Sequence, residues 1–328
     1  MTLTLRSKYL AVFLSLWLVS CTEVPKDLLR QQAISAEGTV AGAISPTSQL
    51  LAVSSLTSGI VIWDTNTSKA KFRLSHGDPT QNLVTHLVFS ADGKYLLSAD
   101  PSNAALWDMQ DGKNLGFWAM QAGVTIRDIA VSDFGRHLLI GQSDGKIQHI
   151  TLKSGRRLEF QGHSENINAV AISPNGRYAL TGSSDLHSYF WDTDSAQILQ
   201  SISHPNRVTR VALDPQGRFL FSADSLQQAQ IIELKTGRLL SRLQLDRGRV
   251  FSTARFSSDG KWLLTGSPSQ RVSIWNVQTG QRVKDWSVSP SPYAKPPGAV
   301  VYDVALLNNG QVLTLSSSGL AEYWEFKP

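Results

Sequence analysis

The chain contains a single cysteine, Cys21, among its 328 residues. One cysteine cannot form an internal disulfide, so side-chain packing and hydrogen bonds must hold the fold together. The sequence also lacks the His-Glu-x-x-His and Cys-x-x-Cys spacings that bind metal ions. We therefore expect no disulfide framework, no metal site and no cofactor.

Charge is scarce as well. Only 17% of the residues are charged, and the formal net charge is +5. Arg6 and Lys8 lie in a segment that we expect to be removed and that holds no acid, so the mature chain carries 5 − 2 = +3. No basic tract could neutralise many phosphates, so we expect no nucleic-acid partner. No segment after residue 20 keeps a helical apolar period, which favours a β-rich fold.

The N-terminus has the parts of a signal peptide. A positive start is followed by an apolar run at residues 10–19, LAVFLSLWLV. A run of this length fits a signal-peptide core and is too short for a transmembrane helix, which needs ~20 residues. The sequence Leu18-Val19-Ser20-Cys21 then resembles the lipobox of bacterial lipoproteins.

The lipobox implies that residues 1–20 are cut off and that Cys21 receives a diacylglycerol and an acyl chain such as palmitate. Two or three such chains hold a protein stably on a membrane. Thr22, and not Asp, follows the cysteine, which by the sorting rule of enteric bacteria favours the outer membrane. We therefore predict a lipid-anchored protein of the cell envelope that faces the periplasm.

The rest of the chain is repetitive. Short apolar segments end in Trp-Asp or a related pair at steps of 41 to 49 residues: Trp63-Asp64, Trp107-Asp108, Ile150-Thr151, Trp191-Asp192, Ile232-Glu233, Trp275-Asn276 and Trp324-Glu325. A turn glycine repeats in phase with them, at Gly93, Gly135, Gly176, Gly217, Gly260 and Gly310, with Ser48 in its place in the first unit. Glycine suits a turn with positive φ because it has no β-carbon. A period of this length indicates a repeat architecture.

Each unit holds four short β-prone segments. In the fourth unit they are residues 168–172, 178–181, 188–191 and 198–202. The pattern resembles the WD-repeat family, and the fourth unit matches best through Gly162-His163, Ser183-Ser184-Asp185 and Trp191-Asp192. The resemblance implies an all-β, seven-bladed propeller of four-stranded antiparallel blades.

In that family a His, a Ser or Thr, an Asp and a Trp form a buried hydrogen-bonded tetrad. The resemblance assigns these roles to His163, Ser183 (or Thr181), Asp185 and Trp191. The same residue types could form a catalytic triad, but a nucleophilic serine needs an exposed turn and an oxyanion hole. We therefore expect no catalytic residue and no enzyme. The other histidines are scattered among the units, where we expect chance or surface placement: His76, His86, His137, His149, His187 and His204.

The last unit ends at its third strand. Residues 28–34, LLRQQAI, stand just before the first unit, where every other unit has a fourth strand. We predict that they complete the seventh blade, since such closure removes an exposed sheet edge. Residues 28–328 then form a single propeller, and residues 21–27 are a short tether. The six residues 22–27 reach at most ~20 Å, which keeps the propeller close to the membrane.

Partner binding is predicted on one face. The segment at 287–299, SVSPSPYAKPPGA, interrupts the regular period and carries Tyr293 and Lys295 between prolines. Loops before strands of the same face carry the arginines of units five and six, Arg207, Arg210, Arg247 and Arg249. We therefore expect a protein partner with an acidic surface, bound by a monomeric propeller within a complex. The sequence thus predicts a protein–protein interaction scaffold. One alternative is an outer-membrane assembly factor resembling the propeller lipoprotein of the barrel-assembly machinery; a second is a propeller enzyme, a peptidase or a lyase.

Overall fold

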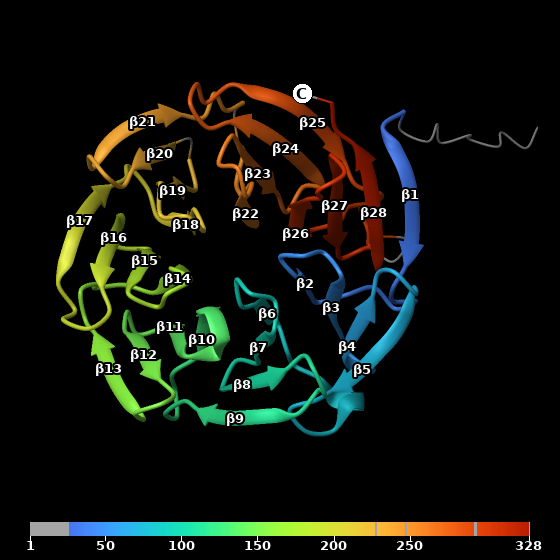
Figure 1. Ribbon diagram of the computed structural model, residues 1–328, viewed down its shortest axis with the longest axis horizontal. Helices are drawn as coiled ribbons and strands as arrows, with labels where there is room; N and C mark the ends of the chain where they lie inside the picture. The colour runs from blue at the N-terminus through green and yellow to red at the C-terminus, as the bar shows by residue number, and fades with distance from the viewer. Residues whose placement is uncertain (1–25, 227, 247, 292–293, 328) are drawn as a thin grey trace, which may run out of the picture.

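The computed structural model describes residues 26–226, 228–246, 248–291 and 294–327. Seven four-stranded antiparallel sheets surround a central axis as blades (Figure 1). The predicted seven-bladed all-β propeller is confirmed. The signal peptide, Cys21, Arg247 and Tyr293 lie outside the described residues.

We number the blades in chain order and give the strands of each from the innermost outward. Blade 1 contains β2 (Ala41–Ile44), β3 (Leu50–Ser55), β4 (Gly59–Asp64) and β5 (Lys69–Leu74), and blade 2 contains β6 (His86–Phe89), β7 (Tyr95–Ala99), β8 (Asn103–Asp108) and β9 (Asn114–Ala119). Blade 3 contains β10 (Ile126–Val131), β11 (His137–Gln142), β12 (Ile147–Thr151) and β13 (Arg156–Phe160), and blade 4 contains β14 (Ile167–Ile172), β15 (Tyr178–Ser183), β16 (His187–Asp192) and β17 (Ile198–Ser203). Blade 5 contains β18 (Val208–Leu213), β19 (Phe219–Asp224), β20 (Ala229–Glu233) and β21 (Arg238–Arg242), and blade 6 contains β22 (Thr253–Phe256), β23 (Trp262–Gly266), β24 (Arg271–Asn276) and β25 (Arg282–Ser287). Blade 7 contains β26 (Val301–Leu306), β27 (Gln311–Ser316), β28 (Leu320–Glu325) and, outermost, β1 (Leu28–Ala33).

Helical structure is minor. In the described ranges it consists of two 3-10 helices in loops between strands, η1 (Pro79–Gln81) and η2 (Asp133–Gly135). Within the part of the chain that is described, no helix combines the length and apolarity needed to cross a bilayer.

Apolar side chains pack between neighbouring blades. The second and third strands of a blade are buried along most of their length, as in β3 and β8, while outer strands such as β5 and β9 are largely exposed. Seven buried clusters result, each of which joins residues of adjacent blades. Burial on both faces explains why the middle strands read as apolar runs rather than as alternating patterns.

Tight turns join the first two strands of each blade. The six predicted turn glycines all have positive φ, from 60° at Gly135 to 80° at Gly310. Ser48 adopts the same conformation with φ 57°, although its β-carbon makes this backbone less favourable. The position therefore follows the repeat even where the residue type does not.

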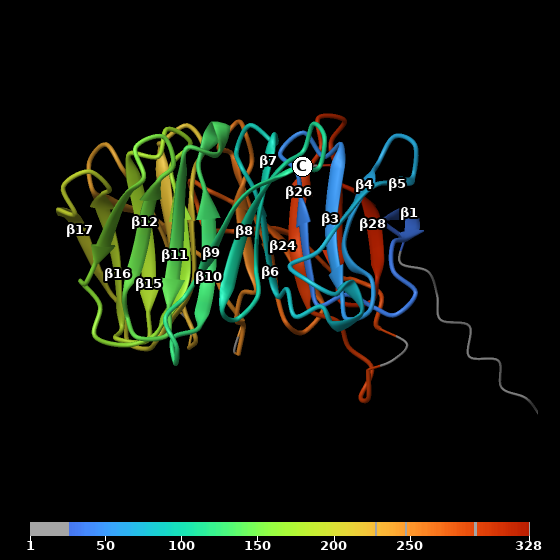
Figure 2. The same ribbon diagram turned by 90° about the horizontal axis from the view of Figure 1, so that it is seen from below.

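The N-terminal strand closes the ring, as predicted. β1 pairs antiparallel with β28, with Leu28 opposite Trp324 and Ala33 opposite Leu320. The strand ends one residue before the predicted limit, and Ile34 is buried just beyond it. β1 is therefore the outermost strand of blade 7 and lies on the circumference of the disc (Figures 1 and 2).

The two flat faces of the disc carry different connections. One face holds the loops between blades and the turns between second and third strands; we call it the loop face. The other holds the tight glycine turns, and we call it the turn face. The segment between β25 and β26 extends beyond its neighbours on the loop face, at the bottom of Figure 2.

Candidate interaction surface

Blade 4 contains the predicted network in altered form. His163 Nδ1 lies 2.8 Å from Asp185 Oδ2, and His163 Nε2 lies 2.9 Å from Thr181 Oγ1. Ser183 instead donates to the backbone carbonyl of Glu165. The indole nitrogen of Trp191 is buried and makes no hydrogen bond within the described structure. Of the two hydroxyl candidates the structure selects Thr181, and Trp191 contributes packing alone.

Blade 2 contains a complete tetrad that the sequence analysis missed. Trp107 Nε1 donates to Ser98 Oγ at 2.8 Å, and Ser98 Oγ lies 2.8 Å from His76 Nε2. His76 Nδ1 lies 2.9 Å from Asp100 Oδ2. Burial alone would raise the pKa of Asp100, but its hydrogen bonds, of which that from His76 has the largest effect, hold the pKa below its usual value. Every polar group of the tetrad therefore has a partner.

Strand register explains where the indole finds a hydroxyl. In blades 2, 4, 6 and 7 the residue opposite the Trp lies two places before a serine or threonine, and we call that place the hydroxyl position. Trp275 donates to Thr265 at 2.8 Å and Trp324 to Thr314 at 3.0 Å. Blade 1 has Val53 at this place, and the indole nitrogen of Trp63 is unpartnered. A hydroxyl at this place is not sufficient for the bond, however, because Trp191 has Thr181 there and its indole nitrogen is also unpartnered.

Blade 5 keeps the polar half of the network. His204 Nε2 lies 2.7 Å from Ser222 Oγ, and His204 Nδ1 lies 3.8 Å from Asp224. Ile232 stands at the Trp position and is buried. Burial lowers the pKa of His204. This histidine, which we expected on the surface, is therefore a core residue.

Two histidines contact each other in blade 3. The rings of His137 and His149 are stacked with centroids 5.2 Å apart, and His137 Nδ1 lies 3.1 Å from His149 Nε2. Burial, followed by the neighbouring His137, lowers the pKa of His149 to about 4. At neutral pH the ring is uncharged and packs as an aromatic side chain.

A serine turn with hydrolase-like spacing also escaped the sequence analysis. Residues 141–145 read Gly-Gln-Ser-Asp-Gly. A nucleophile elbow joins a strand to a helix, whereas this turn joins β11 to β12. Ser143 Oγ accepts a hydrogen bond from the Thr125 backbone at 3.0 Å. The local geometry is that of a hairpin, not of an elbow.

Ion pairs line the inner strands around the axis. Arg255 Nη2 lies 2.8 Å from Asp303 Oδ2, which also accepts from the Ile44 backbone at 2.8 Å. Asp303 thus links blades 6, 7 and 1. Burial raises its pKa, and Arg255 opposes that effect. Asp128 accepts from the Val170 backbone at 2.9 Å and pairs with Arg210 at 3.5 Å, which links blades 3, 4 and 5.

The predicted cations on the loop face have unequal surroundings. Arg210 is engaged with Asp128 and with the Ser252 carbonyl. The Arg249 side chain is only 9% exposed and pairs with Asp246 and Asp285. Arg207 and Lys295 are exposed, and neither takes part in an ion pair within the described structure. The structure therefore separates two accessible cations from two that serve the fold.

A hollow lies on the loop face between blades 7 and 1. It has a volume of about 320 Å³ and is lined by residues that include Val40, Leu56 and Ser291. Ser291 belongs to the segment between β25 and β26, whose base is fixed by hydrogen bonds between Ser291 and Gly298 and between Ser289 and Glu322. The interrupting segment therefore forms one side of the hollow.

Exposed leucines add to this face. Leu56 is 58% exposed and Leu83 65%, and the Leu56 carbonyl accepts a hydrogen bond from Asn82, next to Leu83. Leu186 and Leu226 occupy the corresponding turns of blades 4 and 5 and are also exposed. Large apolar side chains at turn tips do not stabilise the core, so they are available to a partner.

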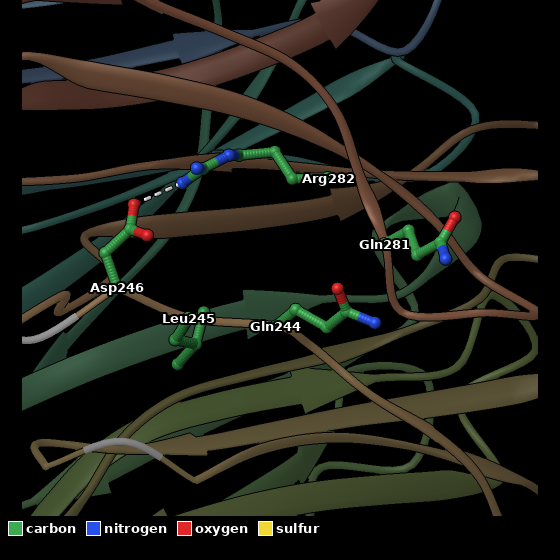
Figure 3. Close-up of a pocket in the computed structure, with 5 residues that line it drawn as sticks. All are labelled: Gln244, Leu245, Asp246, Gln281 and Arg282. Carbon is green, nitrogen blue, oxygen red and sulfur yellow. Dashed lines mark hydrogen bonds and ion pairs between the residues drawn. The ribbon is translucent and has the colours of Figure 1, made fainter.

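A second hollow lies on the side of the disc between blades 5 and 6 (Figure 3). It has a volume of about 470 Å³ and is lined by Gln244, Leu245, Asp246, Gln281 and Arg282. Arg282 pairs with Asp246 across it. No group of three metal-ligating side chains occurs among the described residues, here or elsewhere.

Comparison with protein families agrees with this geometry. Residues 69–108, 155–192 and 237–276 match the WD40 model, described as WD domain, G-beta repeat. Each match begins at the start of the outer strand of one blade, or one residue before it, and ends with the third strand of the next blade. No curated protein matches the chain. The chain therefore carries WD40 repeats, folded as a seven-bladed β-propeller.

Proposed function

We propose that this chain is a lipid-anchored scaffold of the bacterial cell envelope, held at the outer membrane and facing the periplasm, which binds a protein partner through its loop face. A WD40 propeller is in itself typical of a protein-interaction scaffold. The observation that carries the choice of face is the hollow beside the β25–β26 segment, bordered by the exposed Leu56.

Charge suggests the chemistry of the partner. Lys295 lies in the segment between β25 and β26, and Arg207 precedes β18 on the same face. Both are exposed, whereas Arg210 and Arg249 are already paired with carboxylates. An acidic patch on the partner would complement the two free cations, with the leucines supplying apolar contact.

We propose no catalytic role for the chain. The His163–Asp185 pair is buried and its hydroxyl partner, Thr181, is fully buried. The two inner-strand acids, Asp128 and Asp303, are each held by an arginine and a backbone amide. Such groups stabilise the ring and are poorly placed to meet a substrate.

Replacing Cys21 with Ser tests the anchor. The serine hydroxyl cannot form the thioether, so the precursor should stay uncut or be released from the membrane. Gel mobility and membrane fractionation measure both effects, with metabolic palmitate labelling as a direct readout. A variant that is still processed, labelled and membrane-bound would exclude Cys21 as the lipid site.

Charge reversal on the loop face tests the partner site. Lys295→Glu with Arg207→Glu should lower capture of the partner from cross-linked native membranes about tenfold or more, because each reversed charge opposes an acidic patch. The matched control, Lys94→Glu with Lys261→Glu, makes the same charge change on the turn face. Mass spectrometry should identify a protein that the control retains and the loop-face variant loses. Equal capture by both variants, at unchanged melting temperature, would rule out this face.

A further inference from the structure

The circumference of the disc is uneven in charge. Residues 26–33, which include β1, and residues 69–74, which form β5, together hold five cations and one acid. By contrast β9 and β17 contain no charged residue, and β13 holds two arginines and a glutamate. We call the surface formed by β1 and β5 the basic wall; its cations are Lys26, Arg30, Lys69, Lys71 and Arg73.

The two strands of the basic wall are neighbours. Figure 1 places β1 and β5 next to each other on the outside of blades 7 and 1, and Ser68 Oγ lies 3.4 Å from Gln32 Oε1 between them. β13 and β17 lie on the opposite side of the ring (Figure 1). Other outer strands also carry cations, two arginines in β21 and an arginine, a lysine and an aspartate in β25, but β1 and β5 form the most basic pair of neighbouring outer strands.

The cations of the basic wall are exposed, and Asp64 of β4 lies opposite Lys69 in the strand pairing. All five are exposed, and none of them takes part in an ion pair within the described structure. The one acid, Asp27, is already paired with Lys284 at 2.9 Å. Arg30 lies over the Tyr323 ring at 4.0 Å and Lys71 donates to the Met109 carbonyl, which holds both side chains on this surface. Leu29, beside Arg30, is 49% exposed.

The N-terminal segment that precedes the described residues joins the chain at the basic wall. Lys26 is the first described residue, and it leads directly into β1 at the circumference. A tether of six residues between Cys21 and β1 spans at most ~20 Å. An anchor at Cys21 would therefore draw the side of the disc, not either flat face, towards a bilayer.

We propose that the basic wall lies against an anionic phospholipid surface, so that the propeller stands on edge at the membrane. The proposal rests on the proposed anchor, and it explains how so short a tether leaves the loop face open to a partner. Cations near an anionic bilayer gain from its negative surface potential, and an exposed leucine adds apolar contact.

Flotation with vesicles tests the wall without the anchor. Residues 22–328 contain every strand of the seven blades and omit the cysteine, so this chain retains the whole fold. It should float with vesicles of phosphatidylglycerol and phosphatidylcholine in equal parts, stay behind with phosphatidylcholine alone, and be released by added salt. Each cation near such a surface contributes about fivefold in binding, so Lys69→Glu with Arg73→Glu should weaken it about 30-fold or more.

The matched control is Arg238→Glu with Arg242→Glu. These arginines hold the equivalent positions of β21 in blade 5, on another part of the circumference. The control should bind almost as the parent chain does; the milder pair Lys69→Gln with Arg73→Gln should give an intermediate loss if the glutamate variant fails to fold. No binding to anionic vesicles, or equal loss in both glutamate variants, would overturn the basic wall. Neither result bears on Cys21, whose lipidation is read separately by labelling.

Discussion

Deletion of residues 28–33 is expected to abolish cooperative folding of the propeller. The deletion removes β1 and leaves the β28 edge unpaired over the stretch from Leu320 to Trp324. It also removes Gln31, which donates to the fully buried Glu322 at 2.8 Å, and Leu28, which packs against the cluster between blades 6 and 7. The combined loss of ladder bonds, apolar burial and a partner for a buried carboxylate is comparable with the ~5–15 kcal/mol stability of a whole domain. Urea melts and size-exclusion chromatography should show a broad transition and aggregation.

A permuted chain provides the control. If residues 28–34 are moved behind Lys327 through a turn like the one that joins β4 to β5, blade 7 acquires a fourth strand in the ordinary direction, because β1 runs antiparallel to β28. This chain should recover a sharp transition near that of the parent. A deletion variant that melts as the parent does would show that blade 7 does not need β1.

The number of blades was predictable because the repeat holds its phase where its residues change. Ile150 and Ile232 stand in the Trp position and keep the register of β12 with β11 and of β20 with β19. Burial between blades requires an apolar side chain there and not a particular one. The predicted strand limits in blade 4 were too short, because each of its four strands is longer than the predicted segment. Pairing of the end residues depends on the neighbouring strand, which a local pattern does not contain.

The tetrad of blade 2 was not predictable from spacing. His163 and His204 lie 13 residues before the turn glycines Gly176 and Gly217, whereas His76 lies 17 residues before Gly93. The added residues accommodate η1, which lengthens the loop without moving the imidazole from its place beside Ser98. A motif with fixed spacing therefore misses His76, although the folded loop places its ring beside the hydroxyl of its blade, as in blades 4 and 5.

The burial of Arg249 was not predictable either. The sequence analysis grouped it with surface arginines because it lies in a loop between blades. The structure turns its side chain inward, where the guanidinium contacts Ser273 at 2.6 Å and lies 5.8 Å from the Trp275 ring. Its acid partners, Asp246 and Asp285, come from different segments, so only the tertiary arrangement reveals that the charge is compensated.

Replacing Trp191 with Ala is expected to destabilise the propeller by about 3–5 kcal/mol, as for other large buried aromatics. The Trp191 side chain is fully buried, and its ring is stacked on Phe160 with centroids 4.3 Å apart. Thermal or urea melts measure the loss. His163→Ala and Asp185→Ala should each cost less, about 1–3 kcal/mol, since each leaves polar partners in the network without their bonds. A catalytic triad would give the opposite pattern, in which the melts stay unchanged and hydrolysis is lost.

Two further substitutions separate packing from hydrogen bonding. Trp191→Phe and Trp107→Phe remove the same atoms from buried sites, but only the Trp107 indole donates a hydrogen bond, to Ser98. Trp107→Phe should therefore cost about 1 kcal/mol more than Trp191→Phe. Ser98→Ala should cancel most of that difference in a double-mutant cycle, since it removes the acceptor. If the two phenylalanine variants lose equal stability and the cycle shows no coupling, the indole bond does not contribute, and shape alone maintains tryptophan at the blade contacts.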